Sequence, residues 1–241
     1  ISFNALSSPT YGDGPIVLVA TSTSGLPVAF ESSTESVASI SGTTLTINGA
    51  GTTTISALQI GDGNYTSAGI VFQTLTVNRA EQSISFDAIP TSTYGDGPIA
   101  LSASASSSLP VSYESSNESV ASISGNTVTI QGAGSATITA SQTGDNNYNP
   151  ASENQVLTVG EAPLTVTALD QVINAGDMPV VSFIYDGFVN GDNDGNVFGG
   201  SPGYSINPNY SGDAGTYAII PSASALNYDI TNVAGELFVN P

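Results

Sequence analysis

One loop of the chain carries the residues whose type and spacing could best support chemistry. Residues 190–196 read NGDNDGN, so oxygen-bearing side chains fall at alternate positions, at Asn190, Asp192, Asp194 and Asn196. Calcium takes roughly six to eight oxygen ligands in proteins, which makes this set a candidate calcium site. The bidentate glutamate that closes many calcium loops is missing at the usual spacing, so a turn without a metal is the competing interpretation.

Further carboxylates recur in glycine-rich turns. Asp13, Asp96 and Asp177 each follow a glycine, and Asp62 and Asp145 lie near asparagines in two related loops. Such turns could complete a calcium site where neighbouring domains meet. Aspartate also suits turns for a simpler reason, because its side chain hydrogen-bonds to nearby backbone groups. We therefore expect no required cofactor and keep calcium as a candidate ion.

Tyrosines recur in equivalent loops, at Tyr11, Tyr65, Tyr94 and Tyr148. An exposed aromatic ring can stack on a sugar, whereas tyrosines at equivalent positions of a repeat more often fill the end of a domain or the joint to the next one. Threonine-rich runs such as residues 43–46 could bind a polysaccharide, but threonines that alternate with apolar residues are good strand formers. We favour packing as the role of the tyrosines and strand formation as the role of the threonines.

Composition excludes several classes of protein. The 241 residues include 1 Lys or Arg and 20 Asp or Glu, and the net charge of −19 repels nucleic acid and anionic lipid. With 0 His and 0 Cys, disulfides, zinc thiolate sites and histidine-dependent triads cannot form. The single base is Arg79, so lysine chemistry, including Schiff bases and isopeptide bonds, is excluded as well. No motif places paired carboxylates in a cleft, and no apolar run approaches the roughly 20 residues of a membrane span. We predict that the protein is not an enzyme and does not insert into a membrane.

The chain contains an internal repeat of long period. The sequence TYGDGPI at residues 10–16 returns at residues 93–99, which is 83 positions later. A fixed period of this length indicates tandem small domains. A third segment follows the same plan with a different sequence, and it has NAGD at residues 174–177 in place of the tyrosine-containing turn. We predict domains at residues 1–79 (repeat 1), 80–160 (repeat 2) and 161–241 (repeat 3), with short joints at residues 78–82 and 160–163.

Strand signals dominate every repeat. Residues 43–47 and 52–57 alternate polar and apolar side chains, and glycine-rich turns separate the two runs. The longest apolar run, residues 179–185, also indicates a strand, and no stretch shows sustained helical periodicity. About seven short strands per repeat predict an all-β fold: a tandem array of three Ig-like β-sandwich domains.

The three repeats resemble bacterial Ig-like families. Repeat 1, and repeat 2 with it, resembles the bacterial Ig-like group-two pattern through residues 31–33 (ESS), 37–41 (VASIS) and 49–55 (GAGTTTI). Repeat 3 resembles the MBG type of mostly bacterial Ig-like repeats through residues 185–192 (YDGFVNGD), 215–217 (GTY) and 227–230 (NYDI). The resemblance implies large secreted or surface-anchored proteins, often adhesins, in which such modules form stalks. It implies no catalytic residues.

These observations together predict a structural stalk or spacer segment of a bacterial cell-surface or secreted adhesin. The expected partners are the neighbouring Ig-like repeats of the same chain, which we expect to continue beyond this segment, and the expected location is extracellular. Two alternatives stay open. Sandwich edges without lysine could accept a strand from another chain, which would make the protein a self-associating subunit of a filament. Exposed aromatic rings could instead make it a carbohydrate-binding module.

Overall fold

The computed structural model describes residues 1–241, and strands make up nearly all of its regular structure. The chain forms two compact units. Unit 1 comprises Ile1–Ser85, Ala103–Val111 and Ser141–Glu153, and unit 2 comprises Phe86–Ser102, Ser112–Ala140 and Asn154–Pro241. Unit 1 thus contains repeat 1, unit 2 contains repeat 3, and the segments of repeat 2 are divided between them. The predicted boundaries of the three domains stay a prediction.

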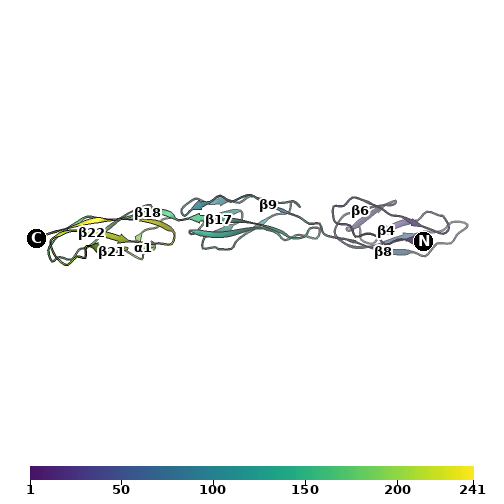
Figure 1. The fold of residues 1–241 in the computed structure, drawn as a ribbon. Helices are drawn as coiled ribbons and strands as arrows, with labels where there is room; N and C mark the ends of the chain where they lie inside the picture. The colour runs from purple at the N-terminus through teal and green to yellow at the C-terminus, as the bar shows by residue number, and fades with distance from the viewer. The chain divides into compact units, whose positions relative to one another are not determined.

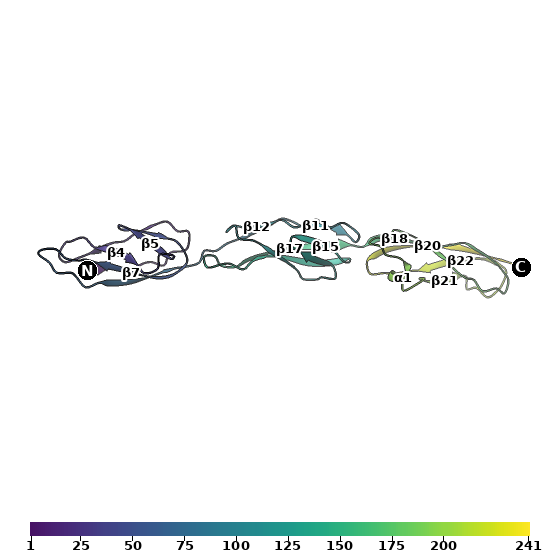
Figure 2. The same cartoon turned by 180° about the vertical axis from the view of Figure 1, so that it is seen from behind.

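Repeat 1 contains eight short strands in three sheets, and several are labelled in Figures 1 and 2. They are β1 (Ser2–Phe3), β2 (Ile16–Val17), β3 (Ala20–Thr21), β4 (Ala29–Ser32), β5 (Ala38–Ser41), β6 (Thr44–Ile47), β7 (Gly51–Leu58) and β8 (Val71–Val77). The sheet orders are β2-β6-β5, β4-β7-β8 and β1-β3. The alternation predicted for residues 43–47 and 52–57 corresponds to β6 and β7, whose inward side chains are buried.

The core of repeat 1 lies between these sheets. Leu45 on β6, Ile55 on β7 and Leu75 on β8 are fully buried, so side chains from both three-stranded sheets meet in one cluster. Phe3 and Phe30 close the cluster with ring centroids 5.3 Å apart. This arrangement of two sheets over a shared apolar layer is that of a β-sandwich.

Repeat 2 repeats this plan. Its strands are β9 (Ile84–Phe86), β10 (Ser92–Thr93), β11 (Ile99–Ala100), β12 (Ala103–Ala105), β13 (Ser112–Ser115), β14 (Ala121–Ser124), β15 (Thr127–Ile130), β16 (Gly134–Gln142) and β17 (Ala151–Gly160). The β11-β15-β14 sheet of unit 2 corresponds to the β2-β6-β5 sheet of unit 1. Val128 is fully buried, as is Leu45 at the position 83 residues earlier, so the sequence repeat is also a repeat of buried positions.

Repeat 3 lies entirely within unit 2 and has a four-stranded and a three-stranded sheet, ordered β19-β24-β22-β21 and β20-β18-β23. Its elements are β18 (Ala162–Ala168), β19 (Gln171–Asn174), β20 (Phe183–Asp186), α1 (Asp194–Val197), β21 (Gly203–Asn207), β22 (Gly215–Ser222), β23 (Tyr228–Val233) and β24 (Gly235–Asn240). The strand predicted at residues 179–185 is shorter than expected, because β20 begins only at Phe183 and Val180 is largely exposed. No helix of the chain is long enough to cross a membrane.

Candidate functional site

Three of the four tyrosines that the sequence predicted to pack, Tyr11, Tyr94 and Tyr148, lie where one repeat follows another, whereas Tyr65 is 52% exposed. Within unit 1, Tyr11 of repeat 1 contacts Tyr148 of repeat 2, and we call this place joint 1. Within unit 2, Tyr94 of repeat 2 contacts Tyr228 of repeat 3, and we call this place joint 2. The same construction therefore occurs twice in the chain, and it is the candidate functional site.

The backbone connection in joint 1 leaves a single residue unpaired. Asn78 donates its N–H to Pro9 O and accepts from the N–H of Tyr11, at 2.8 and 2.9 Å. Two residues later, Ala80 donates to Asn147 O at 2.8 Å and accepts from the N–H of Asn149 at 2.9 Å. Only the exposed Arg79 lies between the two paired positions.

Joint 2 has the same connection. The N–H of Tyr94 donates to Gly160 O at 2.9 Å, and the N–H of Ala162 donates to Asn227 O at 2.9 Å. Glu161 stands alone between the two paired residues, as Arg79 does in joint 1. Backbone pairing on both sides of one residue leaves little conformational freedom to the connection, in contrast to a flexible glycine–serine linker.

Side chains add the same two contacts to each joint. The rings of Tyr11 and Tyr148 meet edge to face, with centroids 5.5 Å apart and an interplanar angle of 86°. The rings of Tyr94 and Tyr228 do so at 5.6 Å and 87°. Edge-to-face geometry is the favoured arrangement of aromatic pairs and contributes about 0.5–1.5 kcal/mol beyond burial of area.

An asparagine completes each joint. Asn147 Oδ1 accepts a hydrogen bond from the N–H of Ala50 at 2.9 Å in joint 1. Asn227 Oδ1 accepts one from the N–H of Ala133 at 3.0 Å in joint 2. Each asparagine directly precedes the tyrosine of its joint, and each alanine is the middle residue of a Gly-Ala-Gly turn. Two adjacent residues of one repeat thus contact two separate turns of the preceding repeat.

The turns that present Tyr11 and Tyr94 are built by their aspartates. Asp13 Oδ2 accepts from the N–H of Thr10 at 2.8 Å, and Asp96 Oδ2 accepts from the N–H of Thr93 at 2.7 Å. The intervening glycines have φ of 93° and 99°, a conformation that glycine adopts without strain at the third position of a type II turn. Asp177 accepts from Asn174 in the same way in repeat 3. The structure therefore gives these three carboxylates a turn-forming role.

A second aspartate organises the loop that receives the tyrosine. Asp145 Oδ1 accepts from the N–H groups of Asn147 and Tyr148, at 2.8 Å in both cases. Asp62 Oδ1 makes the equivalent bonds to Asn64 and Tyr65, at 2.8 and 2.9 Å. These loops are thus shaped by local side-chain-to-backbone hydrogen bonds, which is the ordinary role of aspartate in turns.

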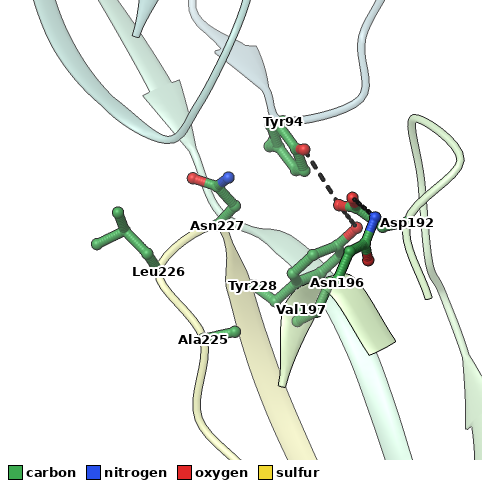
Figure 3. Close-up of a pocket in the computed structure, with 8 residues that line it drawn as sticks. All are labelled: Tyr94, Asp192, Asn196, Val197, Ala225, Leu226, Asn227 and Tyr228. Carbon is green, nitrogen blue, oxygen red and sulfur yellow. Dashed lines mark hydrogen bonds between the residues drawn. The ribbon is translucent and has the colours of Figure 1, made fainter. Parts of the chain in front are cut away.

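Joint 2 has contacts that joint 1 lacks. Figure 3 shows the hydroxyl groups of Tyr94 and Tyr228 both directed at the Asp192 carboxylate. Tyr228 donates to Asp192 Oδ2 at 2.6 Å and Tyr94 donates to the same oxygen at 3.1 Å. A small hollow of about 170 Å³ lies beside these groups. Tyr94 is accordingly 8% exposed, whereas Tyr11 is only partly buried.

The environment of Tyr228 favours its neutral form. The side chain is 4% exposed, and burial, followed by the hydrogen bond to the Asp192 carboxylate, raises the pKa of Tyr228 to about 12 from 10.0. A tyrosinate at this position would lose solvation and face a negative charge. Tyr228 is therefore a hydrogen-bond donor to Asp192 throughout the physiological pH range.

Aromatic packing positions the loop that carries Asp192. Phe188 contacts Tyr228 edge to face at 5.8 Å, and it also packs against Tyr185 and Phe198 at 5.3 and 6.2 Å. The Val189 N–H donates to the Tyr228 hydroxyl oxygen at 3.1 Å. These contacts fix both ends of the loop, so that Asp192 reaches the two tyrosines.

The structure brings only part of the predicted calcium set together. Asp192 Oδ1 accepts from Asn196 Nδ2 at 3.2 Å, while Asp194 begins α1 and accepts from the N–H of Gly195. Asn190 has a φ of 55° and belongs to a turn before the helix. No group of three or more His, Cys, Asp or Glu side chains is placed to hold a metal ion anywhere in residues 1–241. Calcium stays a prediction, and the geometry gives Asp192 a second role as the acceptor for two tyrosines.

Sequence reasoning missed the helix and the asparagine acceptors. Asn193 caps α1 and forms a capping box with Asn196, a pattern that was present in the sequence. Asn147 and Asn227 each precede a tyrosine, and this shared Asn-Tyr pair was the signal that could have identified both acceptors. Their alanine partners lie more than 90 positions away, so the sequence did not indicate the pairing.

The chain has limited similarity to solved structures of other proteins. No curated protein matches the chain. Solved structures with similarity include Sidekick-1 immunoglobulin domains 1-5 (13% identity, 100% of this chain and 58% of that chain, TM-score 0.36) and surface layer protein SbsC, domains 1-6 (14% identity, 99% and 40%, TM-score 0.29). Drosophila N-cadherin EC1-3 is a third (10% identity, 88% and 89%, TM-score 0.32).

The chain therefore spans about 58% of the length of the Sidekick-1 fragment and about 40% of the SbsC fragment. The resemblance of residues 1–160 to the group-two Ig-like pattern stays a hypothesis. The family match covers repeat 3, where the MBG resemblance is confirmed: residues 164–238 match the family described as MBG domain (YGX type).

Proposed function

We propose that the chain is a non-catalytic spacer segment of a large repetitive adhesin, located on the bacterial cell surface or secreted from the cell. The observation that carries the proposal is the duplicated joint. Both joints use a tyrosine pair, an asparagine that accepts from an alanine N–H, and a connection with one unpaired residue. A protein that holds successive domains at fixed spacing needs this kind of joint at every step.

The contacts at each joint oppose bending. A free linker samples many backbone conformations, and ordering each residue costs about 1–2 kcal/mol. Here the residues on both sides of Arg79 and Glu161 are already paired with the adjoining repeats. Each joint also has an aromatic pair worth about 0.5–1.5 kcal/mol. A joint of this kind resists rotation without a large interface.

Composition and the MBG match support the remaining parts of the proposal. The MBG-type match of repeat 3 supports a structural role. The net charge of −19 favours solubility and repulsion between like chains, which suits a surface exposed to the medium. The two alternatives make different predictions: a filament subunit grows in size as concentration rises, and a carbohydrate-binding module gives specific signals on a glycan array.

Small-angle X-ray scattering of the full chain tests the spacer proposal. A compact globule of this length has a radius of gyration of roughly 18 Å, and a spacer requires a clearly larger value. Tyr11→Ala and Tyr94→Ala should broaden the distance distribution, because each removes an aromatic pair at a joint. Tyr65→Ala is the matched control, since Tyr65 is 52% exposed and contacts no other ring. A radius near 18 Å that none of these variants alters would refute the proposal.

A further inference from the structure

Repeat 1 carries the receiving half of a joint without a partner. Its loop at residues 61–66 has the same hydrogen bonds as the loop that presents Tyr148. Asp62 and Asp145 accept from equivalent pairs of N–H groups, and Gly61 and Gly144 have φ of 79° and 78°. Asn64 and Tyr65 thus occupy the positions that Asn147 and Tyr148 occupy in joint 1.

The exposure of this loop differs from that of its two counterparts. Tyr65 is 52% exposed, whereas Tyr148 is partly buried and Tyr228 is 4% exposed. The neighbouring Ile60 is 89% exposed. Tyr65 is therefore left in solvent at the position where the tyrosines of the other two repeats make a joint.

We infer that the Asn64–Tyr65 loop is a docking surface for a further Ig-like repeat placed before Ile1 in the same chain. The occupant is defined by the joints already formed. It presents a Tyr-Gly-Asp-Gly turn, whose tyrosine packs on Tyr65, and a Gly-Ala-Gly turn, whose alanine N–H donates to Asn64. This inference rests on the proposed spacer function and names the partner of the surface.

A second copy of the chain is a poorer occupant. Repeat 3 has Ala175 at the position of Tyr11 and Tyr94, directly before the glycine of the equivalent turn. The equivalent turn of repeat 3 therefore has no tyrosine at this position to place against Tyr65. Repeats of the first two types have the complete donor half, with Tyr11 and Ala50 or with Tyr94 and Ala133. The Asn64–Tyr65 loop thus favours a preceding repeat that resembles repeat 1 or repeat 2.

The test is an extended chain in which a copy of residues 1–83 precedes Ile1. This design gives Ile1 the same preceding residues that Ile84 has. Amide hydrogen exchange measured by NMR should show that the N–H of the Ala50 copy in the added repeat is protected. Asn64→Ala in the original repeat 1 should reduce that protection by roughly tenfold. Tyr65→Ala should lower the unfolding temperature of the extended chain by roughly 2–4 °C.

Matched variants separate this inference from the spacer proposal. In the 241-residue chain Tyr65→Ala should leave the unfolding temperature unchanged, while Tyr148→Ala should lower it in both chains. An effect of Tyr148→Ala with none of Tyr65→Ala or Asn64→Ala in the extended chain overturns the docking surface and leaves the spacer proposal standing. No effect of Tyr148→Ala counts against the spacer proposal itself. Concentration-dependent association of the 241-residue chain that Tyr65→Ala abolishes would assign the surface to a second copy and overturn the inference.

Discussion

The three equivalent turn glycines provide a test of joint 2 with internal controls. Gly12, Gly95 and Gly176 have φ of 93°, 99° and 89°, so replacement by alanine carries a similar backbone cost at each position. A left-handed conformation costs an L-residue about 1–2 kcal/mol. The surroundings differ, because a Cβ at Gly12 or Gly176 meets nothing within 4 Å. Only at Gly95 would the added Cβ meet an atom of the next repeat.

A Cβ at Gly95 would lie 2.7 Å from both Cβ and Cγ2 of Val189 and 3.0 Å from its Cγ1. Carbon atoms prefer separations of about 3.5–4.0 Å, so the overlap approaches 1 Å. Overpacking of this kind costs about 1–3 kcal/mol in addition to the backbone term. If the turn moves away from Val189 instead, Tyr94 loses its hydrogen bond to Asp192, and a comparable amount of stability is lost.

We therefore expect Gly12→Ala and Gly176→Ala to destabilise the chain by about 1–2 kcal/mol, and Gly95→Ala to destabilise it by about 2–5 kcal/mol. Differential scanning calorimetry of the full chain measures the difference. Val189→Ala should rescue part of the loss at Gly95 and none at Gly12, because it removes the clashing methyl groups. Equal losses at the three glycines, or the absence of rescue, would refute the reasoning.

Tyr94→Phe should lower the unfolding temperature more than Tyr11→Phe, because the Tyr94 hydroxyl donates to a carboxylate, a bond worth about 1.5–3 kcal/mol; equal shifts in calorimetry would contradict this. The pKa of Tyr228 is raised to about 12 from 10.0, so the folded chain keeps a proton that the unfolded chain has lost. Stability should consequently be unaffected by this group below about pH 10 and fall by about 2–3 kcal/mol up to about pH 12. Urea titrations should show that slope, and a slope that Tyr228→Phe does not reduce would argue against it. Millimolar calcium should raise the melting temperature more than magnesium does, and Asp192→Ala/Asp194→Ala should reduce the shift; equal melting in calcium and in chelator would end the calcium hypothesis.

Much of the fold was predictable because its signals are local. Alternation of threonine with apolar residues predicted β6 and β7, since a strand that buries one face needs a two-residue period. The 83-residue repeat predicted that Leu45 and Val128 would be equivalent, and both are fully buried. The strand predicted from residue 179 was wrong over its first half. Apolar composition alone does not show whether a segment has a sheet edge to pair with.

The candidate site was predictable only in part. The recurrence of Tyr11 and Tyr94 suggested packing at domain ends, and this is where the structure places them. The calcium interpretation of residues 190–196 rested on oxygen spacing along the chain. In the fold, Asp192 accepts hydrogen bonds from Tyr94 and Tyr228, which lie 98 and 36 positions away. Neither spacing nor composition contains that information.

The sequence by itself determined the all-β class, the repeat, and which residue types stand in each turn, because these follow from local conformational preference and periodic burial. Only the tertiary structure decided which residues meet. Tyr11 packs on Tyr148 and Ala50 donates to Asn147 because the ends of successive repeats are brought together by pairing on either side of Arg79. Contacts of this kind depend on the three-dimensional path of the backbone, which side-chain identities along the chain do not specify.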